Sequence, residues 1–320
     1  MNIAITGAGG FLGQRLAAAH LSDPAVGRLV LADVVPAQPN GGDGRVRLLE
    51  GDLSDPSAAA AVAEGADVIF HLAAVVSGQA EADFDVGMKV NLDATRCLLE
   101  AARAGGRLPR FVFASSLAVF GPPLPATVTE GTAVNPQSSY GAQKAIGELL
   151  VADYSRKGFV DGRVVRLPTV CVRPGRPNAA TSSFASSIIR EPVRGEPALC
   201  PVGSELELWL SSPRTAVANL VRAALMPAAA LGAQRILNLP GITVSVGEMI
   251  AALSRVAGPA AASRIVFSPD PVASRIVSSW PARFDVGRAI SLGFSRDSTF
   301  DDLIREFLAD EAAAAKVRQA

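Results

Sequence analysis

The sequence predicts an α/β protein built on a doubly wound parallel sheet, with a smaller cap formed by C-terminal segments. Three observations predict this fold. An apolar strand at residues 2–6 opens the chain and leads directly into a glycine-rich turn and a helical pattern. Strand and helix patterns then alternate about six times up to Leu167, as in a parallel sheet with helices on both faces. After Pro168 the alternation stops, so we expect a smaller unit there.

The bulk properties exclude several classes of function. The chain has 320 residues, and its 30 Lys and Arg balance its 30 Asp and Glu, so we expect no nucleic-acid partner. No apolar run is long enough to cross a bilayer, so no membrane partner is expected. Three scattered cysteines, Cys97, Cys171 and Cys200, argue against disulfides and favour the cytoplasm. With His20 and His71 they give no metal-ligand spacing, so we expect no metal.

The glycine-rich turn at residues 6–13 is the first functional signal. It follows the strand 2–6 and opens a helix that runs to about Leu21. In this context glycines allow a tight turn and a close approach of backbone to a pyrophosphate at the helix N-terminus. The turn residues expected to contact a dinucleotide are Gly7, Gly10, Phe11, Leu12 and Gly13.

The second strand, 28–32, ends at Asp33, which indicates the type of dinucleotide. A carboxylate about 20 residues after the glycines can accept hydrogen bonds from a ribose hydroxyl pair and would repel a 2′-phosphate. The residues that follow, Val34, Val35 and Pro36, supply no positive charge. The sequence therefore favours NAD over NADP.

The third and fourth strands carry further candidates at their C-terminal ends. Strand 46–49 leads to Asp52, which either contacts the adenine ring or caps the helix that begins near Pro56. Strand 67–70 ends in His71, which we interpret as a packed or capping histidine. Small residues after it would let a cofactor lie against the backbone at this edge of the sheet.

A long helix is expected at 80–104. Its buried polar residue, Asn91, is either a structural amide or part of a proton relay. The fifth strand, 110–114, leads to Ser115 and Ser116, and a serine here can hydrogen-bond a substrate oxygen at the same sheet edge. A proline-rich loop follows at 122–138, and loops of this length often belong to binding sites.

The loop leads to a helix on which Tyr140 and Lys144 are four residues apart and therefore share one face. A nearby cation favours the phenolate and lowers the pKa of a tyrosine. Tyr140 could then take a proton from an alcohol near neutral pH. The sixth strand, 163–167, completes the alternating region.

The C-terminal region mixes further sheet elements with the cap. A helix at 213–226 and a strand at 235–239 are expected to return to the sheet. We expect a dinucleotide-binding domain at 1–168 plus about 213–240, and a substrate-binding cap at 169–212 and 241–320. The other elements expected in the cap are a helix at 181–190, a strand at 206–210, and helices at 245–257 and 299–315.

Taken together, these motifs resemble the extended short-chain dehydrogenase/reductases, the NAD-dependent epimerase/dehydratase family. The resemblance covers the whole chain and implies a Rossmann-type fold, NAD as cofactor, and a homodimer formed through helices near 80–104 and 139–157. It implies a catalytic set of Ser116, Tyr140, Lys144 and Asn91. The implied cofactor contacts are Gly7, Gly10, Phe11, Leu12, Gly13, Asp33, Asp52, Leu53, Leu72, Ala73, Ala74, Asn91, Tyr140, Lys144 and Pro168.

Within the family, the runs 166–178 and 209–214 resemble those of D-erythronate dehydrogenases, which oxidise the C2 hydroxyl of a four-carbon sugar acid. An arginine suits a carboxylate because its fork binds both oxygens. Arg173, Arg176 and Arg214 compete for that role. The candidate substrate contacts are Ser77, Ser116, Tyr140, Asn178 and Arg214.

We therefore expect NAD-dependent oxidation of a small sugar acid at C2, with D-erythronate converted to 2-dehydro-D-erythronate as the first choice. One alternative is a nucleotide-sugar epimerase or dehydratase, although Phe120 stands where many relatives carry tyrosine. An alternative of another class is a non-catalytic NAD-sensing protein.

Overall fold

The computed structural model describes residues 1–35, 43–175 and 180–319 and confirms the α/β fold. Its centre is a seven-stranded sheet in the order β10-β6-β5-β4-β1-β2-β3, and every pairing in it is parallel. The strands are β1 (Asn2–Thr6), β2 (Arg28–Asp33), β3 (Val46–Glu50), β4 (Val68–His71), β5 (Arg110–Ser116), β6 (Asp161–Leu167) and β10 (Ile236–Asn238).

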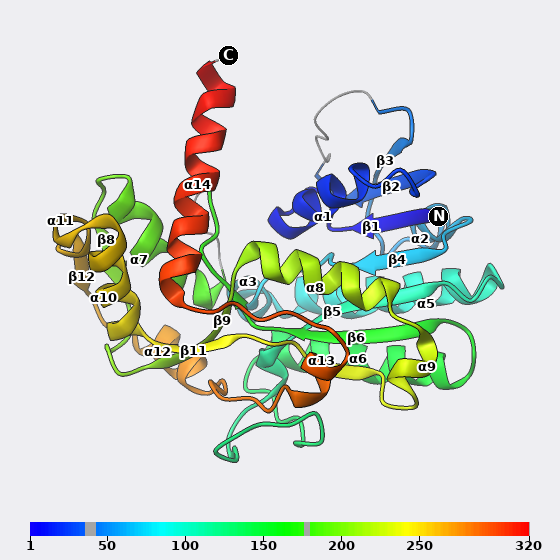
Figure 1. Cartoon of the computed structure of the whole chain (residues 1–320). Helices are drawn as coiled ribbons and strands as arrows, with labels where there is room; N and C mark the ends of the chain where they lie inside the picture. The colour runs from blue at the N-terminus through cyan, green and yellow to red at the C-terminus, as the bar shows by residue number, and fades with distance from the viewer. Residues whose placement is uncertain (36–42, 176–179, 320) are drawn as a thin grey trace.

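Helices cover both faces of this sheet (Figure 1). Alternate residues of β1 serve the two faces, because Ile3 and Ile5 belong to one buried apolar cluster and Ala4 belongs to another. The first cluster includes residues of α1 (Phe11–Leu21) and α8 (Pro213–Leu225). The second includes residues of α2 (Pro56–Ala63), α5 (Ala94–Ala104) and α6 (Ser139–Arg156).

The strand order reverses between β1 and β4, which are neighbours in the sheet and are followed by connections on opposite faces. Open α/β sheets bind ligands at such a switch point, outside the carboxyl ends of the strands. The glycine-rich turn follows β1, and the small residues 72–75 follow β4. The sheet topology thus brings these two predicted cofactor segments together.

The expected single helix at 80–104 is wrong, because the chain forms several shorter elements there. Asp83 interrupts the helix, and its side chain accepts a hydrogen bond from Val86 N (3.0 Å). A Cβ on Gly87 would lie 2.5 Å from Gln143 Nε2, so the absence of a side chain at Gly87 lets α6 approach closely. The elements are α3 (Ser77–Ala82), α4 (Phe84–Gly87), a π-helical turn η1 (Met88–Asp93), and α5.

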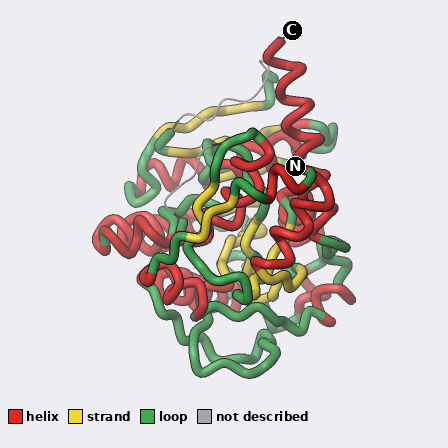
Figure 2. Tube along the Cα trace, turned by 90° about the vertical axis from the view of Figure 1, so that its left-hand side faces the viewer, coloured by secondary structure: helices red, strands yellow, loops and turns green. Residues whose placement is uncertain are grey.

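The C-terminal segments form a second apolar core and two small sheets beside the main body. One sheet joins β7 (Thr169–Val170), β9 (Glu207–Ser211) and β11 (Ile242–Ser245), and the other joins β8 (Ala198–Cys200) and β12 (Ile265–Phe267). The helices here are α7 (Phe184–Val193), α10 (Val246–Ala257), α11 (Pro259–Ala262), α12 (Pro271–Ser278) and α14 (Phe300–Gln319). The end of α14 stands clear of the rest of the chain (Figure 2).

The remaining elements connect the two cores. Val286, Ala289 and Phe294 belong to the apolar cluster of the main sheet although they lie within the segment 241–320. Trp280 packs against both cores. The short connecting elements are η2 (Leu117–Val119), η3 (Thr181–Ser183), α9 (Ala228–Leu231) and α13 (Gly287–Ser291). Within the described ranges, no helix is both long and apolar enough to cross a membrane.

Candidate active site

Two hollows at the switch point together form one elongated groove. One is about 430 Å³ and is lined by Asp33, Asp52 and Leu53, among others. The other is about 310 Å³ and is lined by residues of the helix that carries Tyr140 and Lys144. Both hollows share the lining residues Gly7, Gly10, Leu72 and Ala74. A continuous groove of this kind suits a dinucleotide that extends from one side of the switch point to the other.

The glycine-rich turn forms a cradle that side chains would fill. A Cβ on Gly7 would lie 2.7 Å from Ala73 N, and a Cβ on Gly13 would lie 2.1 Å from Gly7 O. Gly10 is the N-cap of α1 and provides no side-chain cap for that helix. The first N–H groups of α1 are therefore left for an anion, and the groove fits a pyrophosphate.

Asp33 lies at the end of β2 beside this cradle. Its Oδ2 accepts a hydrogen bond from Gly9 N (2.8 Å), and its Oδ1 accepts one from Val35 N (3.1 Å). The carboxylate therefore has a defined position in the groove, where its charge opposes a 2′-phosphate.

Asp52 lines the same hollow, and one of the two roles considered for it is wrong. The cap of α2 is Asp55, whose Oδ1 accepts from Ser57 N (2.8 Å). Asp52 instead accepts from Ser54 and pairs with Lys89 (2.8 Å), and these contacts lower the pKa of its carboxyl to about 2. Its position leaves contact with the adenine ring as a proposal.

His71 is a packed histidine, as expected, and its tautomer follows from its partners. Thr95 Oγ1 donates to Asn91 O (2.7 Å), so it must accept from His71 Nε2 (2.9 Å). His71 Nδ1 then accepts from Thr6 Oγ1 (2.8 Å), which itself accepts from Ala73 N (3.3 Å). Complete burial lowers the pKa of His71 to about 3, so this chain of hydrogen bonds is neutral.

Asn91 clamps the connection after β4. Its Oδ1 accepts from Val75 N (2.9 Å), and its Nδ2 donates to Val75 O (3.2 Å) and to Gln143 Oε1 (2.7 Å). Both amide hydrogens are used, and the residue does not line the groove. This geometry favours the structural amide over the proton relay, the two roles that the sequence left open.

The smaller hollow brings Ser116, Tyr140 and Lys144 together. Ser116 ends β5, and Tyr140 and Lys144 lie in the first two turns of α6. A Cβ on Gly141 would lie 2.1 Å from Ala118 O, so the glycine after Tyr140 lets the helix start lie against η2, which follows β5. Lys144 Nζ is 5.8 Å from the centre of the Tyr140 ring.

The pKa of Tyr140 differs from the expectation that Lys144 would lower it. Burial raises the pKa of Tyr140, and the charge of Arg173 and the Ser116 hydroxyl oppose this rise only in part. The pKa of Lys144 is itself lowered by burial, to about 8, with the Glu148 carboxylate opposing the shift. In this structure the cation that favours the phenolate is therefore Arg173.

Arg173 lines the hollow that contains Tyr140, and the sequence named it only as one of three competing arginines. Its Nε donates to Val170 O (3.0 Å), which orients the guanidinium group. No carboxylate pairs with it among residues 1–175 and 180–319. It follows β7 at the carboxyl end of that strand, and this placement distinguishes it from Arg214.

The expectation that Arg214 contacts substrate is not supported by its position. It does not line either hollow, its side chain is 73% exposed, and it pairs with Glu306 (3.6 Å) on α14. Arg176 and Asn178 lie outside the described residues. No residue of the loop 122–138 lines either hollow, and Val128 in this loop pairs with the segment around Phe284.

Other predicted residues line the groove, and several lining residues were missed. Phe11, Leu12, Gly13, Ser77 and Pro168 line the hollow of Tyr140, and Ala73 lines the hollow of Asp33. Sequence reasoning missed the lining residues Thr169, Val170, Ser182 and Trp280. Thr169 and Val170 directly follow Pro168 within the run 166–178, whereas no local pattern marks Ser182 and Trp280, which the folded cap brings to the sheet edge.

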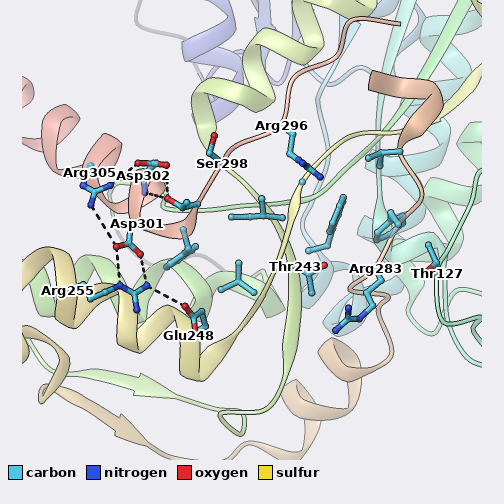
Figure 3. Close-up of a pocket in the computed structure, with 18 residues that line it drawn as sticks. Thr127, Thr243, Glu248, Arg255, Arg283, Arg296, Ser298, Asp301, Asp302 and Arg305 are labelled. Carbon is cyan, nitrogen blue, oxygen red and sulfur yellow. Dashed lines mark hydrogen bonds and ion pairs between the residues drawn. The ribbon is translucent and has the colours of Figure 1, made fainter. Parts of the chain in front are cut away.

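A larger pocket, of about 980 Å³, lies elsewhere and differs in character (Figure 3). Its charged side chains largely neutralise one another: Arg255 pairs with Asp301 (2.7 Å), and Arg305 pairs with Asp302 (2.8 Å). It contains none of the predicted site residues. Across the described ranges, no group of three or more His, Cys, Asp and Glu could hold a metal ion.

The fold and the groove define a dinucleotide-binding enzyme of the Rossmann type. The model of the "NAD dependent epimerase/dehydratase family" matches residues 3–230, and the chain belongs to this family. The chain is an NAD-dependent oxidoreductase, which confirms the expected cofactor and sets aside the non-catalytic alternative.

Three similar proteins illustrate this relationship. The D-erythronate dehydrogenase of Cupriavidus necator is 54% identical over 324 residues, covering 98% of this chain and all of the relative. That of Haemophilus influenzae is 51% identical over 312 residues, covering 96% and 99%. A crystal structure described as a nucleoside-diphosphate-sugar epimerase, from Agrobacterium tumefaciens, is 44% identical with a TM-score of 0.92, covering 98% of this chain and 95% of that one.

Proposed function

We propose that this enzyme oxidises the C2 hydroxyl of D-erythronate to give 2-dehydro-D-erythronate, with NAD as the oxidant. The observation that carries this proposal is the position of Arg173 beside Tyr140 in the smaller hollow. A guanidinium group there can bind a carboxylate through both oxygens and place the neighbouring C2 hydroxyl at the phenol. The similarity to two D-erythronate dehydrogenases supports the choice of acid.

The chain's own residues supply the proton chemistry. Tyr140, as the phenolate, takes the proton of the C2 hydroxyl, and Ser116 donates a hydrogen bond to the same oxygen. Arg173 favours the phenolate and holds the substrate carboxylate. Lys144 holds the nicotinamide ribose. When bound, NAD accepts the hydride that leaves C2, so the alcohol becomes a ketone and NAD becomes NADH.

NADH absorbance with a panel of four- to six-carbon sugar acids, including D-erythronate and L-threonate, tests the proposal. We expect NADH formation with D-erythronate and NAD. Tyr140→Phe should abolish turnover and leave NAD binding intact, whereas Tyr154→Phe, on the same helix but bonded to Glu100, should remain active. Turnover by the Tyr140→Phe variant would rule out this base.

The role of Arg173 has a matched control in Arg214. Arg173→Met should raise KM for D-erythronate at least tenfold, because a buried charge-assisted pair is lost. Arg214→Met should leave KM unchanged, because that side chain is exposed and lies outside the groove. The opposite pattern would show that Arg214, and not Arg173, binds the substrate carboxylate.

A second candidate function is nucleotide-sugar epimerisation, favoured by the likeness to the Agrobacterium tumefaciens structure. An epimerase would hold NAD tightly and return the hydride to its substrate, so no NADH would accumulate. Inactivity across the acid panel together with tightly bound NAD would favour this function.

We also propose a cytoplasmic homodimer formed through α4 and α6, which contact each other. Phe84, Ile146 and Leu149 are large apolar side chains exposed on these helices, a pattern that suits a helix interface. The three cysteines are free thiols, which suits a reducing compartment. Leu149→Glu should convert a dimer to a monomer in size-exclusion chromatography, and a dimer that persists in this variant would exclude the interface.

A further inference from the structure

One carboxylate is buried directly behind the hollow that contains Tyr140. Glu148 lies on α6 four residues after Lys144, so the two side chains share one helix face. Both are only 2% exposed. Among the residues that the structure describes, Glu148 is the only aspartate or glutamate in the buried class. A buried negative charge needs partners, and these partners show what Glu148 holds in place.

Glu148 joins three elements that carry site residues. Its Oε1 accepts from Arg166 Nε (2.8 Å), and its Oε2 accepts from Arg166 Nη2 (2.6 Å), so the pair is bidentate. Ser115 Oγ, on β5, donates to the same Oε1. Ser115 precedes Ser116, and Arg166 lies on the neighbouring strand β6. The carboxylate therefore ties α6 to the strand end that presents Ser116.

Among the described residues, Glu148 is the carboxylate whose charge acts on Lys144. Its Nζ lies 4.7 Å from the centre of the Phe113 ring, and no hydrogen bond or ion pair of Lys144 is present within the described ranges. The other titratable groups near Lys144 are the phenol of Tyr140 and the neutral His71; Arg166 pairs with Glu148, and Arg173 acts on Tyr140. Burial lowers the pKa of Lys144 to about 8, and the charge of Glu148 opposes this shift.

We propose that Glu148 is a positioning residue for the reaction: its charge keeps Lys144 protonated near neutral pH, and its pair with Arg166 holds α6 against β5 and β6. This inference rests on the proposed Ser116–Tyr140–Lys144 mechanism. Glu148 itself transfers no proton and touches no substrate, because it lies behind the lining of the hollow.

The test compares pH profiles of kcat/KM and of NAD affinity for the wild type and Glu148→Gln. Removing the charge should move the alkaline limb of both profiles to lower pH by about one unit. Glu148→Asp keeps the charge, and Ser115→Ala removes one hydrogen bond while keeping the charge. Both controls should retain the wild-type limb even where overall activity falls.

Glu148→Gln leaves Arg166 buried without its partner and could prevent folding. The double variant Glu148→Leu with Arg166→Met replaces the ion pair by apolar side chains and avoids that problem. The double variant removes the carboxylate together with the cation paired to it, so it should still lower the alkaline limb, but by less than Glu148→Gln does. The inference would be overturned by a folded variant that lacks the Glu148 carboxylate but whose pH profiles of kcat/KM and NAD affinity have the same shape as those of the wild type. The NAD titration requires no substrate, so it decides the role of Glu148 even if D-erythronate proves to be the wrong acid.

Discussion

Replacing His71 by glutamine should make stability less sensitive to acid. In the folded chain, burial lowers the pKa of His71 to about 3, whereas an exposed histidine has a pKa of about 6.5. Between these values the unfolded chain binds a proton at His71 that the folded chain does not bind. The stability from neutral His71 is therefore complete above pH 6.5 and falls as the pH drops, by about 1.4 kcal/mol per pH unit.

From pH 7.5 to pH 4.5, the wild type should lose about 2.7 kcal/mol more than His71→Gln. Urea unfolding, followed by the fluorescence of Trp209 and Trp280, measures this difference, because both tryptophans pack in the cores. The variant is expected to be less stable at pH 7.5, since its shorter reach weakens the bonds to Thr6 and Thr95. Carboxylates titrate equally in both proteins. A stability difference that stays constant with pH would refute the assignment of a neutral, buried His71.

Three further predictions concern the cofactor site and the thiols. Gly13→Ala should abolish NAD binding, because the new Cβ would lie 2.1 Å from Gly7 O. Gly44→Ala should bind NAD normally, because no atom lies within 4 Å of a Cβ there. Calorimetric titration with NAD compares the two variants. Asp33→Asn should reduce the preference for NAD over NADP about tenfold in kcat/KM, because a repelling charge is removed; an unchanged ratio would contradict its role. Burial raises the pKa of Cys171 to about 12. A thiol reagent at pH 8 should therefore leave Cys171 unlabelled in the folded protein and label it once the protein is unfolded.

The parts of the site that lie on single short segments were predictable from sequence. The glycine-rich turn lies between a strand and a helix, and its spacing predicts the cradle beside β1. Tyr140 and Lys144 are four residues apart on one helix, so their shared face follows from helix geometry. Asp33 and Ser116 stand at carboxyl ends of parallel strands, which must meet at one sheet edge.

The break in the expected helix at 80–104 shows where such reasoning fails. The local pattern is helical throughout, but Asp83 caps a new helix and Asn91 clamps Val75 in the connection after β4. The Asp83 cap is a contact between residues three apart, but Asn91 and Val75 are 16 residues apart, and α6 approaches at Gly87. Helical periodicity carries no information about such contacts.

The sequence by itself determined the sheet, the cofactor edge and the residue types of the candidate site, because these depend on periodicity and short-range geometry. Only the tertiary structure decided between Arg173 and Arg214 as the arginine near Tyr140, and showed which carboxylate lies behind Lys144. Arg173 and Arg214 look alike in sequence, yet packing of the cap places one in the hollow and the other in solvent. The pKa values of Tyr140 and Lys144 were decided in the same way, since burial is a property of the whole fold and outweighs the charge of a neighbour.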